Sequence, residues 1–494
     1  MKYSILFILL LFQFLFSQIN WTSVYGDTLS LDEGWYISKT NDGNYIVSGM
    51  EHYTAVIKKI NSSGELIWSK TYDNPTESDG YVGDDVIKSV RQVSDGGYIA
   101  AGYFEDEDSW SRVSWIFKTD ESGEVLWSKT YTKNNSTDTW AEDVIETTDG
   151  GFVITGNNKN NGDRAQAMLR KYDDNGELVW HKTYSRSNYN EGISLIETNE
   201  GDIVFVGFSG TSHGAYKHFI VKTDSEGNSL FKKRFGTNTQ QSLNSVIEAL
   251  GGGYIATGYC NNYNDLYIVK FDTGGSILWE HCIPANQDNF YGWDHGNDII
   301  HAQSGGYYIV GTSSTYPQSN GGDDIYLVKI DDLGDTLWTD FIGGTADDQG
   351  QAVVESESGD LIIVGTTWSY TTYPDNNYDS GFYIFSFTPD QILHYDNLKI
   401  SPSTFHLGNA YPNPFNPQTK IQYTIEKESN LDLYIHDLTG KRIKTLFIGH
   451  QSVGSYINNW NGDNNKGQKV SAGLYFYTIA TSSSKQTKKL ILIK

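Results

Sequence analysis

The chain lacks several features that would mark whole classes of protein. After the N-terminus it has no apolar run of the length that a membrane helix needs, about 20 residues, so no integral membrane segment is expected. No extended stretch shows the 3.6-residue apolar period of an amphipathic helix. Positive charge is scarce: 36 Lys and Arg stand against 61 Asp and Glu. The net charge of −25 argues against nucleic acid as a partner, because phosphates would be repelled.

The chain contains a short sequence motif that recurs many times and consists of a turn, an apolar run and a glycine. It reads DGNYIVSG at residues 42–49 and DGGYIAAG at residues 95–102. The closing glycines, spaced by 53, 54, 51, 51, 53 and 54 residues, are Gly49, Gly102, Gly156, Gly207, Gly258, Gly311 and Gly365. A period this regular indicates a repeat architecture.

Each repeat contains four short apolar pieces separated by turn residues. In the second repeat they span residues 85–87, 98–101, 114–118 and 124–131, and their β-branched and aromatic content predicts strands. Four strands in about 50 residues are typical of a β-propeller blade. The middle strands are nearly continuous apolar runs, which fits strands covered on both faces by neighbouring blades.

A large ring recurs in the fourth strand of the repeats, at Trp68, Trp127, Trp180, Phe231, Trp279 and Trp338. We interpret it as a wedge between blades that buries about 150–250 Å² each time. The seventh repeat lacks this strand, and residues 21–26 match it. We therefore expect an all-β, seven-bladed β-propeller of four-stranded blades. The N-terminal strand would close the ring and remove a free sheet edge.

The two cysteines, Cys260 and Cys282, both fall in the fifth repeat, at the ends of its second and fourth predicted strands. They could form a disulfide in an oxidising compartment. Strands two apart in a sheet place their Cα atoms about 9–10 Å from each other. That exceeds the limit of about 7 Å for a disulfide unless a loop moves in, so the sequence leaves both states open.

Residues 1–17 have the features of a secretory signal peptide: Lys2, an apolar stretch over residues 5–11, and Ser17 as a cleavage edge. Residues 396–494 carry a net charge of +6 and the remainder −31, which indicates a domain boundary. The predicted organisation is a signal peptide at 1–17, a propeller at 18–395, a linker at 396–407 and a C-terminal domain at 408–494. The protein is expected to be exported.

The C-terminal region shows alternating apolar and polar residues at 420–425, 431–435, 456–460, 473–479 and 488–494. This pattern over roughly 85 residues predicts a small β-sandwich. Its hallmarks, in order along the chain, are Tyr411, Pro412, Asn413, Pro414, Phe415, Asn416, Pro417, Gly440, Trp460, Gly473, Tyr475 and Lys494.

With these motifs the region resembles the type A sorting domain of the bacterial type IX secretion route, which has an immunoglobulin-like fold. His436 and Asn461 depart from the commoner Tyr and Asp. The resemblance implies a partner, the type IX secretion machinery, and transport of the cargo across the outer membrane. It also implies cleavage of the domain, followed by anchoring of the cargo at the cell surface or its release. The alternative is an additional sandwich domain with no sorting role.

Loops between the second and third strands and loops between blades should share one face of the propeller. Rings there could stack on sugars, and polar groups could read hydroxyls, so a glycan or protein ligand is the expected partner at this face. The candidate binding residues are Trp110, Trp140, Tyr291, Trp293, Asp294, His295, Trp368, Tyr370 and Tyr373. The alternative is that such loops are simply long, polar and variable.

Catalytic and metal sites are not predicted. The Gly-x-Ser-x-Gly pattern around Ser212 lies in a loop rather than in a strand–turn–helix context, and the histidines show no metal-binding spacing. Asp375, Asn377 and Asp379 resemble part of a calcium loop. The glycine comes one place late, at Gly381, and no glutamate closes the loop. A solvated loop is therefore favoured over a Ca²⁺ site, and no other cofactor is expected.

The leading functional hypothesis is an exported, surface-displayed binding propeller delivered by its C-terminal domain. One alternative is an enzyme, either a propeller acting on extracellular glycans or one similar to quinone-dependent dehydrogenases, whose repeats carry a comparable Asp-x-x-Gly-x-x-x-Trp phrase. Those enzymes have dedicated cofactor ligands that we do not find here. A passive surface-coat protein is the other alternative.

Overall fold

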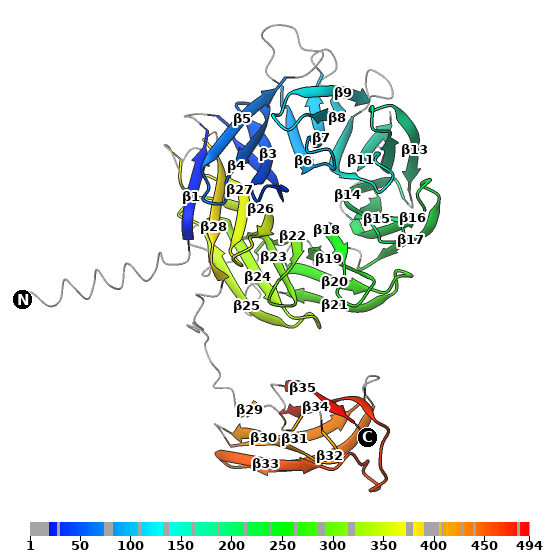
Figure 1. Cartoon of the computed structure of the whole chain (residues 1–494), viewed down its shortest axis with the longest axis vertical. Coiled ribbons are helices and arrows are strands. Elements are labelled where there is room, and N and C mark those ends of the chain that lie inside the picture. The colour runs from blue at the N-terminus through cyan, green and yellow to red at the C-terminus, as the bar shows by residue number, and fades with distance from the viewer. Residues whose placement is uncertain are drawn as a thin grey trace, which may run out of the picture. The chain divides into compact units, whose positions relative to one another are not determined.

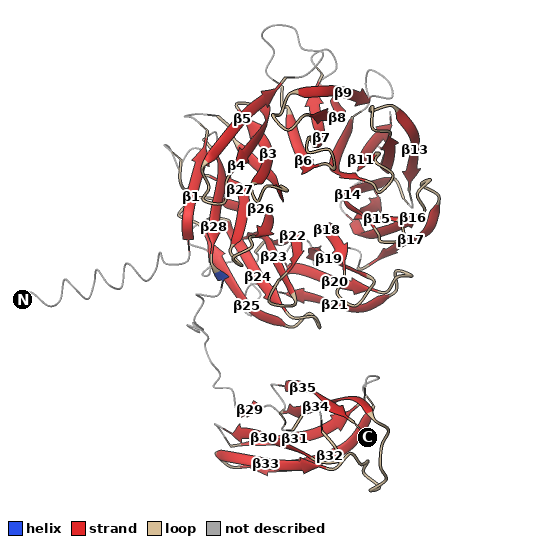
Figure 2. Cartoon of the chain, viewed as in Figure 1, coloured by secondary structure: helices blue, strands red, loops and turns tan. Residues whose placement is uncertain are grey.

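The computed structural model describes much of the chain: residues 19–26, 30–73, 83–106, 111–131, 138–160, 164–185, 187–211, 215–237, 239–260, 265–283, 292–314, 322–371, 379–389, 405–407, 410, 412–413, 415–425, 428–437, 441–481 and 485–493. Two compact units divide the chain, Met1–Gln391 and Ile392–Lys494. Both are built of β-strands (Figure 2). No helix within the described ranges has the length and apolarity to span a membrane.

The first unit consists of antiparallel sheets whose strands are consecutive in the sequence (Figure 1). The first two are β2 (Glu33–Lys39), β3 (Tyr45–Glu51), β4 (Thr54–Ile60), β5 (Leu66–Tyr72) and β6 (Val86–Gln92), β7 (Tyr98–Glu105), β8 (Arg112–Thr119), β9 (Val125–Tyr131). The next two are β10 (Thr139–Glu146), β11 (Phe152–Asn160), β12 (Arg164–Tyr172), β13 (Leu178–Tyr184) and β14 (Tyr189–Glu197), β15 (Ile203–Thr211), β16 (Ala215–Thr223), β17 (Ser229–Phe235). One parallel pairing, of Ala165 with Tyr189, joins these two groups of four into a single eight-stranded sheet. Then follow β18 (Ser242–Glu248), β19 (Tyr254–Cys260), β20 (Asp265–Phe271), β21 (Ile277–Ile283) and β22 (Asp294–His301), β23 (Tyr307–Ser313), β24 (Asp324–Ile330), β25 (Thr336–Ile342).

The last sheet of this unit joins the two ends of its sequence. It contains β26 (Asp348–Glu355), β27 (Leu361–Thr367) and β28 (Gly381–Phe387), and its outer strand is β1 (Ile19–Tyr25). Trp21 pairs with Ser386, and Tyr25 pairs with Phe382. The N-terminal strand thus fills the position that the last repeat leaves empty. Side chains of this sheet also share one buried cluster with the β2–β5 sheet.

The recurring large rings pack between neighbouring sheets, as the sequence predicts. Trp21 and the recurring rings other than Trp338 each lie against the glycine of the turn between the third and fourth strands of the next sheet. The pairs are Trp21–Gly64, Trp68–Gly123, Trp127–Gly176, Trp180–Gly227, Phe231–Gly275 and Trp279–Gly334. These glycines have φ between +72° and +86°, a region that side chains rarely adopt, and any Cβ would run into the ring.

A second contact between sheets, which we did not predict, lies at the ends of the innermost strands. The Glu146 carboxylate accepts hydrogen bonds from the Ser94 N–H at 2.7 Å and the Ser94 hydroxyl at 2.6 Å. Glu197 accepts from Thr148, and Glu248 from Asn199, in the same way. Each carboxylate thereby links the innermost strand of its sheet to the first hairpin turn of the preceding sheet.

Cys260 and Cys282 form a disulfide, with their Cα atoms 6.4 Å apart. The separation of about 9–10 Å expected for strands two apart is therefore wrong for this pair. Both residues lie at the same end of the β18–β21 sheet, where Cys260 pairs with Asp265, the first residue of β20. The regular spacing of strands in the middle of a sheet does not apply at the ends of the strands.

The second unit is a two-sheet sandwich with its own core. One sheet has the order β29 (Phe405–Leu407), β30 (Thr419–Ile425), β33 (Gly454–Trp460). The other has the order β32 (Arg442–Gln451), β31 (Ser429–His436), β34 (Gly473–Ala480), β35 (Lys485–Leu492). Strand β32 was not predicted from the sequence. Its residues are half-buried along most of the strand, so their pattern does not alternate clearly.

Candidate functional site

A bulge occurs at the same place in the innermost strand of every sheet of the first unit. One residue is skipped by the pairing register in β2, β6, β10, β14, β18, β22 and β26. The skipped residues are Trp35, Lys88, Glu142, Ile193, Asn244, Asn297 and Gln351, and all of them line one cavity of about 430 Å³. Bulges re-aim side chains out of the regular pleat, which makes these positions suited to meet a ligand.

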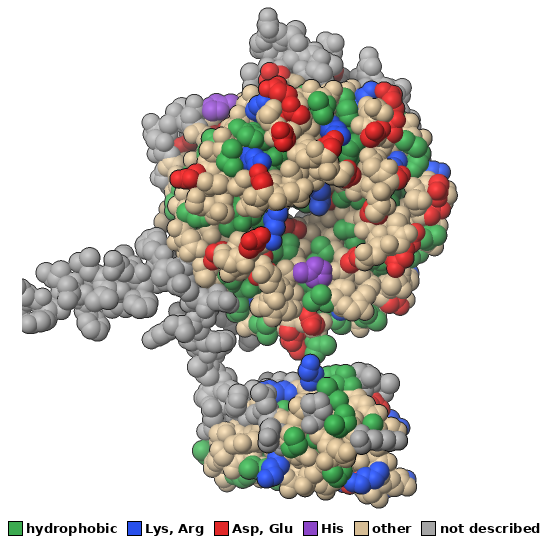
Figure 3. All heavy atoms as spheres, in the orientation of Figure 1, with side chains coloured by type: hydrophobic (Ala, Val, Ile, Leu, Met, Phe, Trp, Pro, Cys, Tyr) green, Lys and Arg blue, Asp and Glu red, His purple; other side chains and the backbone are tan. Residues whose placement is uncertain are grey.

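The two sides of the cavity wall differ in the chemical type of their side chains. Trp35, Lys88 and Glu142 come from consecutive sheets and form an aromatic and charged side. Asn244, Asn297 and Gln351 form an amide side. Amide hydrogens of Asn244 and Asn297 are donated to the carbonyls of Gly296 and Gly350 at 3.1 and 2.8 Å, which fixes both side chains. Figure 3 shows the first unit hollowed in the middle of this view, with basic and acidic side chains around the hollow.

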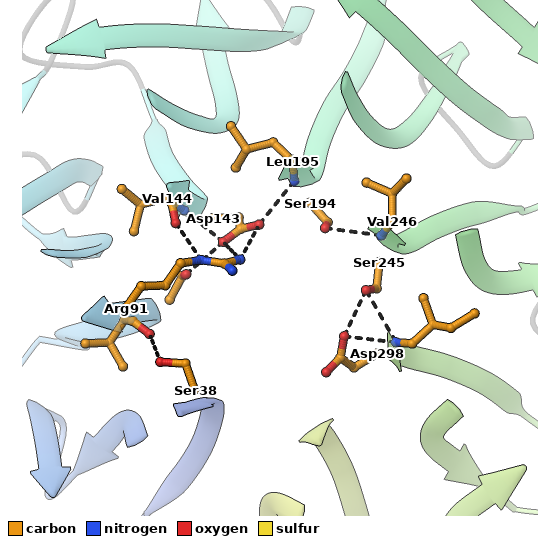
Figure 4. Close-up of polar contacts among 12 residues, drawn as sticks. Ser38, Arg91, Asp143, Val144, Ser194, Leu195, Ser245, Val246 and Asp298 are labelled. Atoms are coloured by element: carbon orange, nitrogen blue, oxygen red, sulfur yellow. Dashed lines mark hydrogen bonds and ion pairs between the residues drawn. The ribbon is translucent and has the colours of Figure 1, made fainter. Parts of the chain in front are cut away.

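Deeper in the cavity, Arg91 bridges two inner strands (Figure 4). Its guanidinium lies 3.0 Å from the Asp143 carboxylate and donates to the Val144 carbonyl at 2.8 Å. Asp143 also accepts the Ser89 hydroxyl and the Leu195 N–H, at 2.7 and 3.1 Å. One carboxylate therefore ties together β6, β10 and β14.

Asp298 has the equivalent position in β22 and makes a similar set of bonds (Figure 4). It accepts the Ser245 hydroxyl at 2.8 Å from β18 and the Val353 N–H at 3.1 Å from β26. Burial raises the pKa of Asp298 to about 6, although these hydrogen bonds lower it. No arginine contacts Asp298 among the described ion pairs, in contrast to Asp143.

The charged side of the cavity contains an amine and a pair of carboxyl groups. The Lys88 amine lies over the Trp35 ring, 2.8 Å from its centroid, and burial lowers the pKa of this lysine. The Glu142 and Glu191 carboxyls lie close enough to influence each other's pKa. Burial raises the pKa of both glutamates, and their proximity raises that of Glu191 further. Trp140 donates its indole N–H to Glu191 at 2.9 Å.

The structure brings the loops of the predicted binding face together by direct hydrogen bonds. The Ser314 N–H donates to the Trp293 carbonyl at 3.1 Å, and the Trp368 N–H donates to the Asp347 carbonyl at 2.8 Å. Trp293 is 61% exposed and Tyr370 is 47% exposed. The Tyr370 ring lies 5.4 Å from that of Tyr383. These rings are therefore available to a partner.

Two other predicted residues lie inside the protein. Asp294 is buried and accepts the hydroxyl of Ser313, and Asp348, at the same position in the next sheet, accepts that of Thr367. Both carboxylates therefore anchor local structure. His295 stacks against Tyr259 at 4.9 Å, and burial lowers its pKa to about 4.

Part of the predicted set lies outside the described residues: Trp110, Tyr291 and Tyr373, together with Asp375 and Asn377 of the calcium-like loop. Asp379 is described and is buried. Within the described ranges no three His, Cys, Asp or Glu side chains are grouped to hold a metal ion.

In the second unit, three residues of the sorting-domain motifs meet in the core. The Trp460 ring lies 5.3 Å from Phe415 and 5.2 Å from Tyr475. The Phe415 N–H donates to the Ile491 carbonyl of β35 at 2.9 Å. Four other motif residues are exposed: Pro412, Asn413, Asn416 and Pro417. The backbone of Gly473 has a φ of +156°. Tyr411, Pro414, Gly440 and Lys494 are outside the described residues.

The second unit matches a known domain. Residues 415–485 match the FlgD Ig-like domain, which agrees with the immunoglobulin-like sandwich. No curated protein sequence matches the chain.

Among solved structures, the chain is similar to PorZ, a surface component of the type-IX secretion system of Porphyromonas gingivalis, at 13% identity and a TM-score of 0.42. That match covers 93% of this chain and 59% of PorZ. A Dyadobacter fermentans protein of unknown function matches at 12% identity and a TM-score of 0.42, over 75% of this chain and 99% of that one. A fungal alcohol oxidase of the AA5 family matches at 11% identity and a TM-score of 0.45, over 96% of this chain and 99% of that one. Similarities at this level carry no inference about activity.

Proposed function

We propose that the first unit is a closed seven-bladed β-propeller that binds an extracellular ligand. Two contacts support the closed ring: β1 pairs with β28, and the Trp21 ring packs on Gly64 of the first sheet. One observation supports binding above all. The bulged residues that line the cavity differ from repeat to repeat, whereas the wedge rings and turn glycines recur. A passive coat protein would have no reason to vary its inner wall while keeping its packing residues.

The experiment is a glycan and protein array probed with the full chain. We expect a specific ligand whose binding is lost in Trp293→Ala and Trp368→Ala, because both side chains lie on the loop face. Leu337→Ala is the matched control, since Leu337 is 52% exposed on an outer strand of the same unit. Ligand binding that survives both tryptophan variants would rule out the loop face.

An enzyme is the second candidate, and the Glu142–Glu191 pair favours it. Two neighbouring carboxyl groups with raised pKa values beside a cavity can act as a general acid and base on a glycan. Turnover of a polysaccharide by the full chain, abolished in Glu142→Gln, would establish this function in place of simple binding.

We also propose that residues 1–17 direct export and that the second unit is the type IX sorting domain. The succession of the motif residues along the chain and the immunoglobulin-like fold support this assignment. Deletion of residues 405–494 should trap the protein in the periplasm of its host, measured by cell fractionation and surface labelling. Normal surface display of the truncated protein would refute the sorting role.

A further inference from the structure

The charged wall of the cavity contains an amine and an acid that lie beyond ion-pair distance of each other. The Lys88 amine lies over the Trp35 ring, and no described carboxylate lies within 4.0 Å of it. Eight other lysines of the first unit do have such a partner. Lys58, Lys59, Lys70, Lys118, Lys129, Lys159, Lys171 and Lys222 each lie within ion-pair distance of a carboxylate.

Glu142 is the counterpart of Lys88 on the next inner strand. No described basic side chain lies within ion-pair distance of it. Its carboxyl neighbours that of Glu191, to which Trp140 donates its indole N–H. The other charged side chains near this wall already have partners within the protein. Arg91 is committed to Asp143, Arg112 lies over Tyr103 and Trp140, and Glu33 accepts the Trp35 indole N–H at 3.1 Å.

An amine and a carboxyl that each lack a close ion-pair partner would each be stabilised by an opposite charge from outside. A molecule that carries both signs satisfies both groups without adding net charge to the cavity. The opposite wall suits the same molecule, because Asn244 and Asn297 place side-chain amides there. Both donate to backbone carbonyls, and the Asn297 oxygen also accepts the Asn244 amide at 3.5 Å. The volume of about 430 Å³ lies in the range of small-ligand sites.

We propose that this cavity binds a small zwitterion, with the ligand carboxylate at Lys88 and the ligand ammonium at Glu142. The ligand class is that of free α-amino acids, in which the two charges are close enough to reach adjacent strands. This site rests on the proposed binding function but not on the loop-face residues.

Isothermal titration of the full chain with each standard amino acid tests the proposal. At least one should bind with Kd below about 1 mM. Its amide, which lacks the carboxylate, and its deaminated acid, which lacks the ammonium, should each bind at least tenfold more weakly. Lys88→Met and Glu142→Gln should each weaken binding at least tenfold. Lys129→Met removes a lysine of the outer strand β9 that is paired with Glu177, and it should not change binding.

Thermal unfolding of each variant checks that the fold is intact. If a variant does not fold, the comparison of the amino acid with its amide and deaminated acid still decides the matter. The proposal fails if no amino acid binds, if the analogues bind equally well, or if folded Lys88→Met retains full affinity. Binding of an array ligand that depends on Trp293 would then leave the general function standing without this site.

Discussion

The ring of Trp21 packs against Gly64, in the same way that Trp127 packs against Gly176 two sheets further along. Trp21 comes from the N-terminal strand, whereas Gly64 belongs to the first complete repeat. The last and first sheets are therefore held together by the contact that holds other neighbouring sheets.

Removal of this ring should weaken the whole first unit. We expect Trp21→Ala to lower the free energy of unfolding by about 3–5 kcal/mol, the usual cost of deleting a packed tryptophan. Urea denaturation followed by circular dichroism measures it. Trp293→Ala is the control and should change stability by less than about 0.5 kcal/mol, because Trp293 is 61% exposed. Equal effects of the two variants would show that Trp21 does not hold the sheets together.

The carboxylate of Glu146 should stabilise the contact with the preceding sheet. Glu146→Ala removes the acceptor of the Ser94 N–H and hydroxyl at an exposed turn, and we expect a loss of about 0.5–1.5 kcal/mol in the free energy of unfolding. Glu226→Ala, on an exposed turn, provides a matched glutamate control. A Glu146→Ala protein as stable as this control would mean that water replaces the carboxylate at no cost.

The ion pair between Arg91 and Asp143 should matter more than a surface pair. Asp143→Asn leaves the Arg91 guanidinium on the cavity wall without its counter-charge, and breaking a buried pair costs about 3–5 kcal/mol. Glu124→Gln breaks the exposed pair with Lys70 and should cost less than about 1 kcal/mol. Urea midpoints of the two variants, compared with the unmodified protein, test the difference. Similar shifts would indicate that solvent screens Arg91 as well.

Asp298 should make stability depend on pH in a defined direction. Its pKa in the folded protein is about 6, above the ordinary value of about 3.9 for an unfolded chain. At pH values between these two, the Asp298 carboxyl is protonated more in the folded state than in the unfolded state. The contribution of Asp298 to stability therefore falls as the pH rises from about 4 to about 6. Asp298→Asn does not titrate, and its stability relative to the unmodified protein should therefore increase over this interval and level off above about pH 7. Parallel stability profiles from pH 4 to 8 would contradict the raised pKa.

The repeat and its packing residues were predictable because each copy satisfies the same local demands. A turn with positive φ selects glycine, and a wedge between sheets selects a large ring, so both recur at a fixed period. The inter-sheet glutamates also recur, at Glu146, Glu197, Glu248 and Glu355. They were missed because a glutamate at a strand end resembles an ordinary exposed residue until its partner in the preceding sheet is known.

The cavity could not be predicted in this way. Trp35, Lys88, Glu142 and Asn244 share one structural position, but they share no chemistry that a sequence comparison would detect. The predicted aromatic set was chosen by residue type in long loops. The structure leaves Trp293 and Tyr370 exposed on such loops, yet buries Asp294, because a carboxylate beside a strand can serve as an anchor as well as a ligand.

The sequence by itself determined the strands, the repeat period, the turns and the wedge rings, because backbone conformation and local burial select particular residues at each copy. It also predicted a small sandwich at the C-terminus from its alternating pattern. Only the tertiary structure decided which side chains face one another across the cavity and that Cys260 reaches Cys282. Those relations depend on strand-end geometry and on bulged positions whose residue types change from repeat to repeat, so the sequence pattern does not reveal them.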